Sequence, residues 1–577
     1  MNNDKFIASQ WFERFWKTVV FIDTSKQWER LFIGFIFLIS AWAIIPLIDT
    51  YYLYTFESDS QSTINISLSF VNALENRNIK LLAELAGYPP YFDAQFLIYA
   101  IVALLLRTLQ HIHLLNLEFL PTAQSLMIFT VRYTNALLNI LSSIILFKSL
   151  QLIKFSNFIS LLVGLIFIFN SQIYEIDLMR IDYVILLLFL VVSYSSLALI
   201  KHPNLKRLSV ALGISFALLI NTKMNALMFG YIPFFSIALL FISHRYSIKN
   251  ICLFLVSFLV TLLLAFCRYI INFNTVISVL TDRTNELKLW YSAISKEPYF
   301  YYNWDYFLKY GHVFLVLILI SITTLIVFLY KYNKQFSIAG FLILSSLIVF
   351  SAIGMLSPKM DRWGIHFIPL YMWTITLAVT FWRYQLKNIR DAKVLKAFFY
   401  LMIVIVFLQP SLLLFKNHQL IVQRIEQRPA SIKITREEPR KWFIKNAPSG
   451  TRVACYKIHT WANPPIFDLP LDFSSNILDY PYLKSEDMAV FMPPTWDALE
   501  ASVDVVLLEN YHKVSHIDSL TEANLTKQAD VWNAFYKELD SRYKRIVFKS
   551  EYENYGINEV LIYVISPKLL NRLEQGR

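Results

Sequence analysis

Charged side chains stand at the ends of hydrophobic segments in this chain, and their types suit group transfer at a membrane surface. The first two are Glu57 and Asp59, which directly follow the first long apolar segment. Carboxylates are costly to bury in lipid, so their position where such a segment meets water invites a functional interpretation. A carboxylate there could be a general base that takes a proton from a hydroxyl. The alternative is a solvated loop after a membrane anchor.

Further charged residues stand at the ends of later segments, on what we expect to be the same face. They are Asp177, Arg180, Asp182, Lys223, Arg268, Lys359, Asp361, Arg362 and His366. The cations suit a phosphate held at the membrane surface. Each residue alone could be an interfacial anchor or half of an ion pair. Carboxylates that occur together with lysine and arginine on one face of the membrane are harder to explain in these structural terms. The sequence has no Walker loop, GxGxxG, nucleophile elbow or His-Glu zinc motif, so nucleotide hydrolysis and serine or zinc chemistry have no support.

The composition predicts a polytopic membrane protein. The chain has 577 residues, of which 56% are hydrophobic and 16% charged, far too apolar for a soluble protein of this length. Its net charge of +12 then fits cytoplasmic loops and lipid headgroups rather than nucleic acid. The three cysteines predict neither a disulfide framework nor a metal cluster. Spans about 20 residues long are predicted near 31–53, 125–147, 155–175, 183–200, 208–222, 226–243, 250–271, 311–330, 336–356, 364–382 and 397–415.

The apolar stretch from Phe92 to Leu106 is short for a span. If it does not cross, the basic clusters in residues 1–30, at Lys201 to Arg207 and at Arg383 to Lys396 all face the same side, as the positive-inside rule requires. We therefore expect an interfacial or re-entrant helix there, within a long first outer loop over residues 54–124.

The predicted fold is an all-α membrane domain of about 11 transmembrane helices, followed by a soluble α/β domain. We expect a cytoplasmic amphipathic segment at 1–30, the membrane domain at 31–415 and the outer domain at 416–577. In the last, β-rich runs occur at 451–458, 503–508, 545–548 and 560–564. A helix is predicted from Pro439 to Asn446. A second carries a stripe of core residues, Trp532, Phe535, Tyr536 and Leu539.

The order of motifs resembles the polyprenyl-phosphate-dependent glycosyltransferases of the C-type superfamily, which include protein O-mannosyltransferases and lipid A aminoarabinose transferases. The family pattern has an acidic residue after the first span, then a Pro-Pro turn entering a short apolar helix. The matching residues are Tyr88-Pro89-Pro90, Arg132 opening the next span, Arg180-Ile181-Asp182, Asn221-Thr222-Lys223, Lys359 to Pro369 and Trp442 to Gly450. Two departures are Glu57-Ser58-Asp59, where the family has Asp-Glu, and Ile181, where it has proline.

The resemblance implies transfer of one sugar from a polyprenyl-phosphate donor to an acceptor hydroxyl on the outer face of the membrane, with inversion. It implies Asp59 as the base, with Glu57 as its competitor, and Asp182 as an assisting residue. Lys223, Arg268 and Arg362 would hold the donor phosphate. Tyr88, Arg180 and His366 would contact substrate.

The sequence names neither the sugar nor the acceptor, which could be lipid A, another glycan or a protein. No metal ligands are assigned, and a divalent metal ion stays open. We expect the inner (plasma) membrane as the location, with a cytoplasmic N-terminus. A polymerase or ligase that uses lipid-linked oligosaccharide is the nearest alternative. A flippase is a third, less favoured because its ionisable groups should lie at mid-membrane.

Overall fold

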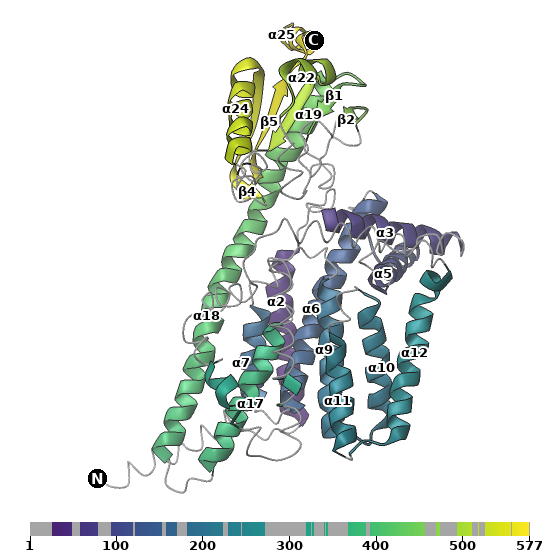
Figure 1. Cartoon of the computed structure of the whole chain (residues 1–577), viewed down its shortest axis with the longest axis vertical. Helices are drawn as coiled ribbons and strands as arrows, with labels where there is room; N and C mark the ends of the chain where they lie inside the picture. Colours follow the sequence, from purple (N-terminus) through teal and green to yellow (C-terminus); the bar gives the residue numbers. More distant parts are fainter. Residues whose placement is uncertain are drawn as a thin grey trace.

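The computed structural model shows a helix bundle with a small sheet region standing beyond one end of it (Figure 1). We call that end of the bundle the sheet-facing end, and the opposite end the far end. The residues that the structure describes are 26–48, 58–78, 94–118, 120, 122–152, 157–169, 182–222, 229–243, 245–271, 319–324, 326–327, 340, 342–343, 367–387, 393–455, 469–473, 493–509, 517, 526–554 and 557–575.

Long apolar helices form the bundle. In the described part they are α2 (Lys26–Ile44), extended by η1 (Ile45–Leu47), α6 (Ala123–Leu152), α7 (Asn157–Ile168), α9 (Asp182–Lys201), α10 (Lys206–Ile220), α11 (Tyr231–Ile242), α12 (Ile248–Ile271), α17 (Phe367–Lys387) and α18 (Lys393–Ile432). Four described stretches are long and apolar enough to cross a membrane: Glu29–Leu47, Ala123–Leu152, Asp182–Lys201 and Ile248–Phe266. The predicted spans at 311–330 and 336–356 lie largely outside the described residues.

Helix α6 is the central element of the bundle. It packs against α2, α7 and α9, while α9 also packs against α10 and α11. Near the far end, Lys148 of α6 pairs with Glu29 of α2. The indole of Trp373 on α17 donates a hydrogen bond to Ser149 Oγ at 2.6 Å. The ion pair is half-buried and the indole bond is buried, and such polar contacts matter because lipid offers no water to satisfy a polar group.

Two helices, α3 (Ser58–Glu75) and α5 (Ala94–His111), lie across the sheet-facing end (Figure 1). One face of α5 buries Phe96, Tyr99 and Ala103, while Leu97 and Ile101 on the other face are exposed. This two-sided pattern explains why α5 lies on the bundle with an apolar stripe outward, as expected for an interfacial helix. The helix begins two residues after the predicted start at Phe92 and continues past Leu106 to His111.

The sheet region contains a five-stranded sheet of order β2-β1-β3-β5-β4. Strands β2 (Asp472–Phe473), β1 (Arg452–Ala454) and β3 (Val505–Glu509) are parallel, and β5 (Ile557–Val564) runs antiparallel to both β3 and β4 (Lys544–Asn554). The two-residue strand β2 was missed in the sequence because it is too short for an alternating pattern.

Helices cover both faces of this sheet. One face packs against α24 (Thr526–Arg542) and α22 (Trp496–Ser502), and the predicted core stripe on α24 is buried there. The other face packs against α19 (Glu438–Asn446) and α25 (Pro567–Glu574) through Phe443 and Leu569. Strand β3 is buried along its whole length because both faces are covered. The domain limits themselves stay predictions.

Helix α18 joins the bundle to the sheet region without a break, running from the far end until it meets β4 (Figure 1). It has 40 residues and passes into the π-helical turn η4 (Lys433–Glu437). Within that turn, Arg436 pairs with Glu509 of β3 at 2.7 Å, with side chains 8% and 2% exposed. A buried charge pair therefore fixes the end of the long helix to the centre of the sheet.

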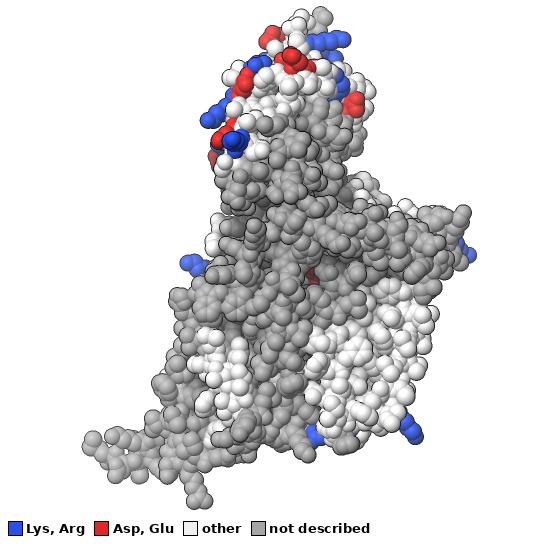
Figure 2. Space-filling view, viewed as in Figure 1, with Lys and Arg blue, Asp and Glu red and all other residues white. Residues whose placement is uncertain are grey.

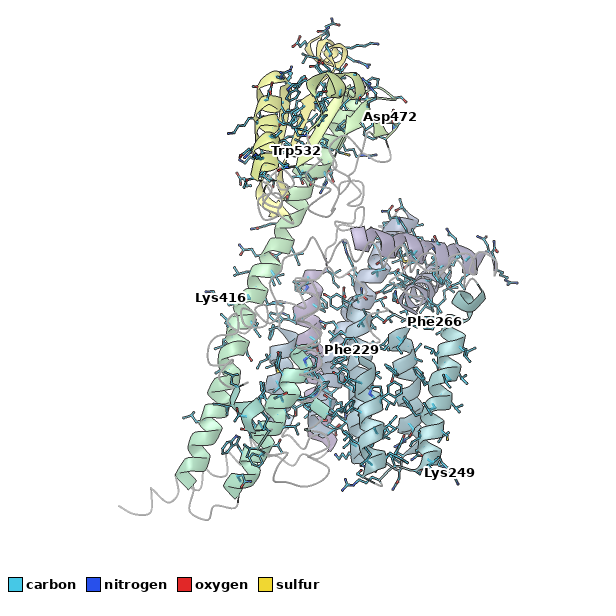
Figure 3. The ribbon with its side chains drawn as sticks, viewed as in Figure 1. Phe229, Lys249, Phe266, Lys416, Asp472 and Trp532 are labelled. Carbon is cyan, nitrogen blue, oxygen red and sulfur yellow. The ribbon has the colours of Figure 1, made fainter. Side chains whose placement is uncertain are left out.

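Charge is unevenly distributed over the described surface. In Figure 2, charged residues gather on the sheet region, a few more lie at mid-height, and basic ones lie at the far end of the bundle, whereas the described bundle surface just above that end is white, that is, uncharged. Figure 3 places Lys249 at the far end, with Phe229 and Phe266 nearer the sheet region. This arrangement suits a protein whose bundle is embedded in lipid.

Candidate active site at the sheet-facing end of the bundle

Three helices bring polar side chains together at the sheet-facing end. Asp182 is the first residue of α9 and is only 5% exposed. Tyr99 of α5 is fully buried and donates a hydrogen bond to Asn135 Oδ1 of α6 at 2.7 Å. Burial raises the pKa of the Tyr99 phenol, the bond to Asn135 lowers it, and the nearby Asp182 charge raises it further. The phenol therefore keeps its proton and acts as a hydrogen-bond donor.

Asp182 stands at the start of a helix. The N-terminus of a helix has free backbone N–H groups and a positive dipole end, which stabilise a carboxylate. Helix α9 also packs against α6, the helix that carries Asn135. The buried carboxylate of Asp182 therefore lies near polar groups, namely the N-terminus of its own helix and the polar side chains of α6.

Arg132 adds a positive charge to the same part of α6. It lies one turn before Asn135 on the same helix face, and its side chain is 1% exposed. The sequence predicted that Arg132 opens its span. This was wrong, because α6 begins at Ala123 and Arg132 lies more than two turns inside it. The buried guanidinium of Arg132 marks a polar layer within the bundle.

Two further polar groups are buried here without a hydrogen-bond partner in the described structure. The amide of Gln95, one turn before Tyr99 on α5, is 0% exposed and has no partner on either atom. The hydroxyl of Ser67 on α3 is likewise 0% exposed and has no hydrogen-bond partner among the described residues. Helices α3 and α5 pack together, with the rings of Phe70 and Phe96 6.4 Å apart. An unsatisfied buried polar group costs about 1–3 kcal/mol, which a bound hydroxyl or phosphate oxygen could offset.

The structure locates some of the predicted site residues. Asp59 lies in the first turn of α3, where a helix start was expected, and Arg268 lies in the last turn of α12; only their backbones are described. Helix α3 packs against α5 and α6, the helices that carry Tyr99 and Asn135. The other predicted site residues lie outside the described part of the chain: Glu57, Tyr88, Arg180, Lys223, Arg362 and His366.

Sequence reasoning did not single out Gln95, Tyr99 or Asn135. The available signal was a polar residue inside an apolar segment, which is uncommon in a membrane helix and often functional. Among the described residues, no group of three or more His, Cys, Asp or Glu side chains could hold a metal ion. What the described arrangement can do is bind and orient a polar ligand beside one buried carboxylate.

Solved structures share this architecture. A crystal structure of ArnT from Cupriavidus metallidurans bound to undecaprenyl phosphate matches with a TM-score of 0.51 at 11% identity, covering 95% of this chain and 99% of the other. The apo form of that protein gives 0.49 at 11% identity, with 94% and 99% covered. AglB from Archaeoglobus fulgidus, an archaeal oligosaccharyltransferase in complex with an inhibitory peptide and a dolichol-phosphate, gives 0.48 at 11% identity, with 94% and 75% covered.

No family model and no curated protein matches the sequence. The first of these structural matches shows that the chain has the fold of ArnT over nearly its whole length. ArnT is a glycosyltransferase of the C-type superfamily, so the predicted resemblance is confirmed at the level of the fold.

Proposed function

We propose that this chain is a membrane glycosyltransferase that moves one sugar from a polyprenyl phosphate to an acceptor hydroxyl, with inversion. The fold shared with ArnT, whose structure contains undecaprenyl phosphate, supports this reaction type. The observation that carries the proposal is the buried Asp182 carboxylate beside Tyr99 at the sheet-facing end. A carboxylate held there suits chemistry at a membrane surface.

Asp59 is the proposed general base. It stands in the first turn of α3, and a helix start has free backbone N–H groups and a positive dipole end that suit a carboxylate. A base there would take the proton of the acceptor hydroxyl as that oxygen attacks the anomeric carbon, while the carbon–phosphate oxygen bond breaks. One direct displacement of this kind inverts the anomeric centre.

Asp182 is proposed to orient the acceptor. A carboxylate repels a phosphate, so its place fits the acceptor side of the reaction better than the donor side. The departing polyprenyl phosphate needs positive charge, for which Lys223, Arg268 and Arg362 are the proposed sources. Tyr88, Arg180 and His366 remain proposed substrate contacts.

Substitution of the two candidate carboxylates tests the mechanism. Asparagine caps a helix about as well as aspartate but cannot accept the proton, so Asp59→Asn should fold, insert and lose at least roughly 10²-fold in transfer. Glu57→Gln should lose less. The measurement is the release of polyprenyl phosphate from a radiolabelled polyprenyl-phosphate sugar, with membrane extract as the acceptor source. A dead Glu57→Gln beside an active Asp59→Asn would reverse the assignment, and two active variants would remove this loop from the chemistry.

We also propose that the sheet region lies outside the plasma membrane and the far end of the bundle in the cytoplasm. Basic residues at the far end, such as Lys201, Lys206 and Lys249, support this orientation. Impermeant thiol labelling of intact cells tests it in a background without native cysteines. Asn571→Cys should react from outside and Lys206→Cys should not; the reverse would invert the topology.

A further inference from the structure

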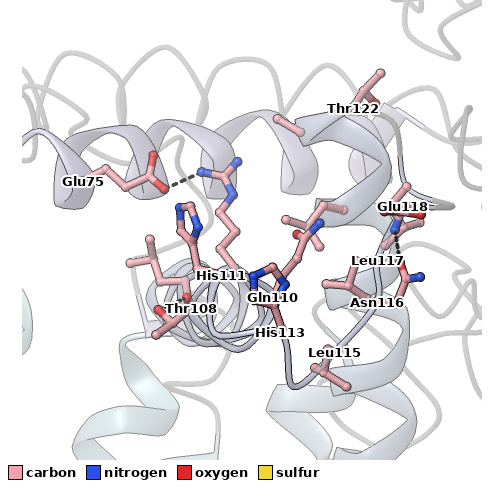
Figure 4. A pocket seen from close by; sticks show the side chains of 15 residues that line it. Glu75, Thr108, Gln110, His111, His113, Leu115, Asn116, Leu117, Glu118 and Thr122 are labelled. Atoms are coloured by element: carbon pink, nitrogen blue, oxygen red, sulfur yellow. Dashed lines mark hydrogen bonds and ion pairs between the residues drawn. The ribbon is translucent and has the colours of Figure 1, made fainter.

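A groove of about 1050 Å³ opens where the C-terminal ends of α3 and α5 meet the start of α6 (Figure 4). One wall is apolar and consists of Leu117, Leu120 and Leu126, which pack together. The polar side chains that argue for a ligand are Glu75, Arg107, Gln110, His111, Asn116 and Glu118. Aliphatic walls with a few converging polar groups are typical of small-molecule sites.

The groove and the candidate active site lie at different points along one face of α5. Residues three or four apart share a helix face, so Tyr99, Ala103, Arg107 and Gln110 follow one another along it. Tyr99 and Arg107 are eight residues apart, which is about 12 Å along a helix. A ligand in the groove would therefore lie on the same side of α5 as Tyr99. The exposed stripe of Leu97, Ile101 and Leu105 occupies a different face.

The charges of the lining argue against a phosphate as the ligand. With histidine counted as neutral, one arginine faces two glutamates, a formal charge of −1. The guanidinium of Arg107 is, moreover, already paired with Glu75. A phosphate site presents donors and positive charge, whereas this groove is slightly negative.

The hydrogen-bonding groups fit hydroxyls instead. Gln110 offers both a donor and an acceptor, and Glu118 offers acceptors. Asn116 offers the N–H groups of its amide, while its Oδ1 already accepts a hydrogen bond from the backbone N–H of Glu118 at 3.0 Å. A sugar hydroxyl is itself both donor and acceptor, and the C–H faces of a sugar ring can lie against the leucine wall.

We propose that this groove binds a neutral oligosaccharide segment of the acceptor. The proposal rests on the proposed function and names the acceptor class: a glycan long enough to reach from the groove to Tyr99 and Asp182. Binding energy gained here, away from the reacting hydroxyl, can be used to place that hydroxyl for attack.

Direct binding tests the inference with the full-length chain in zwitterionic lipid nanodiscs. The probe is an array of neutral, uronic-acid-bearing and phosphorylated oligosaccharides. Wild type should bind neutral members, and Gln110→Ala and Asn116→Ala should each weaken binding roughly 2- to 10-fold, as the loss of a neutral hydrogen bond does. Asn204→Ala, an exposed asparagine at the far end, is the matched control and should change nothing.

Glu118→Gln separates the two ligand chemistries by the sign of its effect. A neutral sugar loses a charged acceptor and binds more weakly, whereas a phosphorylated ligand gains from the lost negative charge and binds more tightly. Tighter binding, binding of phosphorylated members only, or no binding of neutral members would each overturn the proposal.

The assay also separates this inference from the proposed function. Asp59→Asn should retain wild-type binding to the array because Asp59 lies at the other end of α3 from Glu75. If wild type binds neutral glycans but transfers no sugar, the groove is a glycan-binding site and the proposed glycosyltransferase function is refuted. Transfer by wild type without neutral-glycan binding would refute the groove alone.

Discussion

Tyr99 links the candidate site to the packing of the bundle, because its one hydroxyl joins α5 to α6 and lies within the field of the Asp182 charge. This bond holds the face of α5 that faces Asp182 in place.

We expect Tyr99→Phe to lower both stability and transfer. The variant loses one buried hydrogen bond between α5 and α6, which contributes about 0.5–1.5 kcal/mol, and α5 is held less firmly on α6. Tyr246→Phe is the matched control, since Tyr246 has a buried 2.6 Å hydrogen bond with Ser209 at the far end. Thermal unfolding in nanodiscs and transfer assays are the two readouts. Equal loss of transfer in both variants would show that Tyr99 acts through stability alone.

In the sheet region, acid should weaken the pairing of β1 with β3. Arg452 holds Asp504 through its backbone N–H and guanidinium at 2.9, 3.0 and 3.1 Å, and these bonds lower the pKa of the Asp504 carboxyl. The unfolded state then binds more protons than the folded state. The contribution of these bonds to the free energy of unfolding is therefore fully present above the pKa of an unfolded aspartate, about 3.9. It is lost as the pH falls through the lower pKa of Asp504 in the folded state.

Amide hydrogen exchange of Ala454 and Val506, which pair across β1 and β3, measures that loss at decreasing pH. Asp504→Asn should exchange faster near neutral pH and respond less to acid, since no carboxylate remains to be protonated. If exchange in Asp504→Asn accelerated with acid as much as in wild type, the acid effect would come from groups other than Asp504.

Of the residues in the described site, the sequence singled out Asp182 but not Tyr99 or Asn135. Asp182 stood out because charge is rare beside apolar segments, and the role of Asp59 stays a prediction. The partnership of Tyr99 with Asn135 joins residues 36 positions apart and exists only once α5 lies on α6. Packing of this kind leaves no local trace in the chain.

Among the elements, α10 and α12 pack against each other and approach closely at Gly213. A Cβ built on Gly213 would lie 2.6 Å from the backbone oxygen of Phe254 and 2.9 Å from the nitrogen of Phe258. Backbone atoms cannot move aside as a side chain can. Small residues commonly allow such close approach between membrane helices.

Gly213→Ala should therefore destabilise the bundle by about 1–3 kcal/mol, the usual cost of overpacking. Gly34→Ala is the control, because nothing lies within 4 Å of its added Cβ, and helix propensity favours alanine there. Thermal unfolding of both variants in the same lipid is the measurement. An unchanged Gly213→Ala would mean that α10 and α12 can separate without cost.

The elements themselves were largely predictable, and their ends were not. The interfacial helix was found from its length and from charge, and four of the five strands from their β-rich runs. Helix α5 nevertheless extends past Leu106, where Arg107 pairs with Glu75 of α3, a contact that depends on the fold. The two-residue strand β2 owes its existence to its neighbour β1.

At the scale of the whole molecule, the bundle and the sheet region are connected by α18 and by the buried pair of Arg436 and Glu509. Removal of one partner from such a pair typically costs about 3–5 kcal/mol, because the other charge stays buried. Arg436→Gln should therefore loosen the sheet from the helix end. Limited proteolysis between the two parts should become faster, whereas the exposed pair of Arg542 and Glu538 should tolerate Arg542→Gln. Equal protection of both variants would contradict this.

Because α18 is one uninterrupted helix, it also fixes the direction in which the sheet region faces, as a rotation about the axis of α18 relative to the bundle. Forty residues of helix extend about 60 Å, twice the thickness of a bilayer core. One alanine inserted after Gln423 would turn the sheet region by about 100° and raise it by about 1.5 Å. Seven alanines would restore its heading to within about 20° while raising it by about 10 Å. If the sheet region must face the site, transfer across an insertion series will rise and fall with the helical repeat; if only its height matters, transfer will decline steadily.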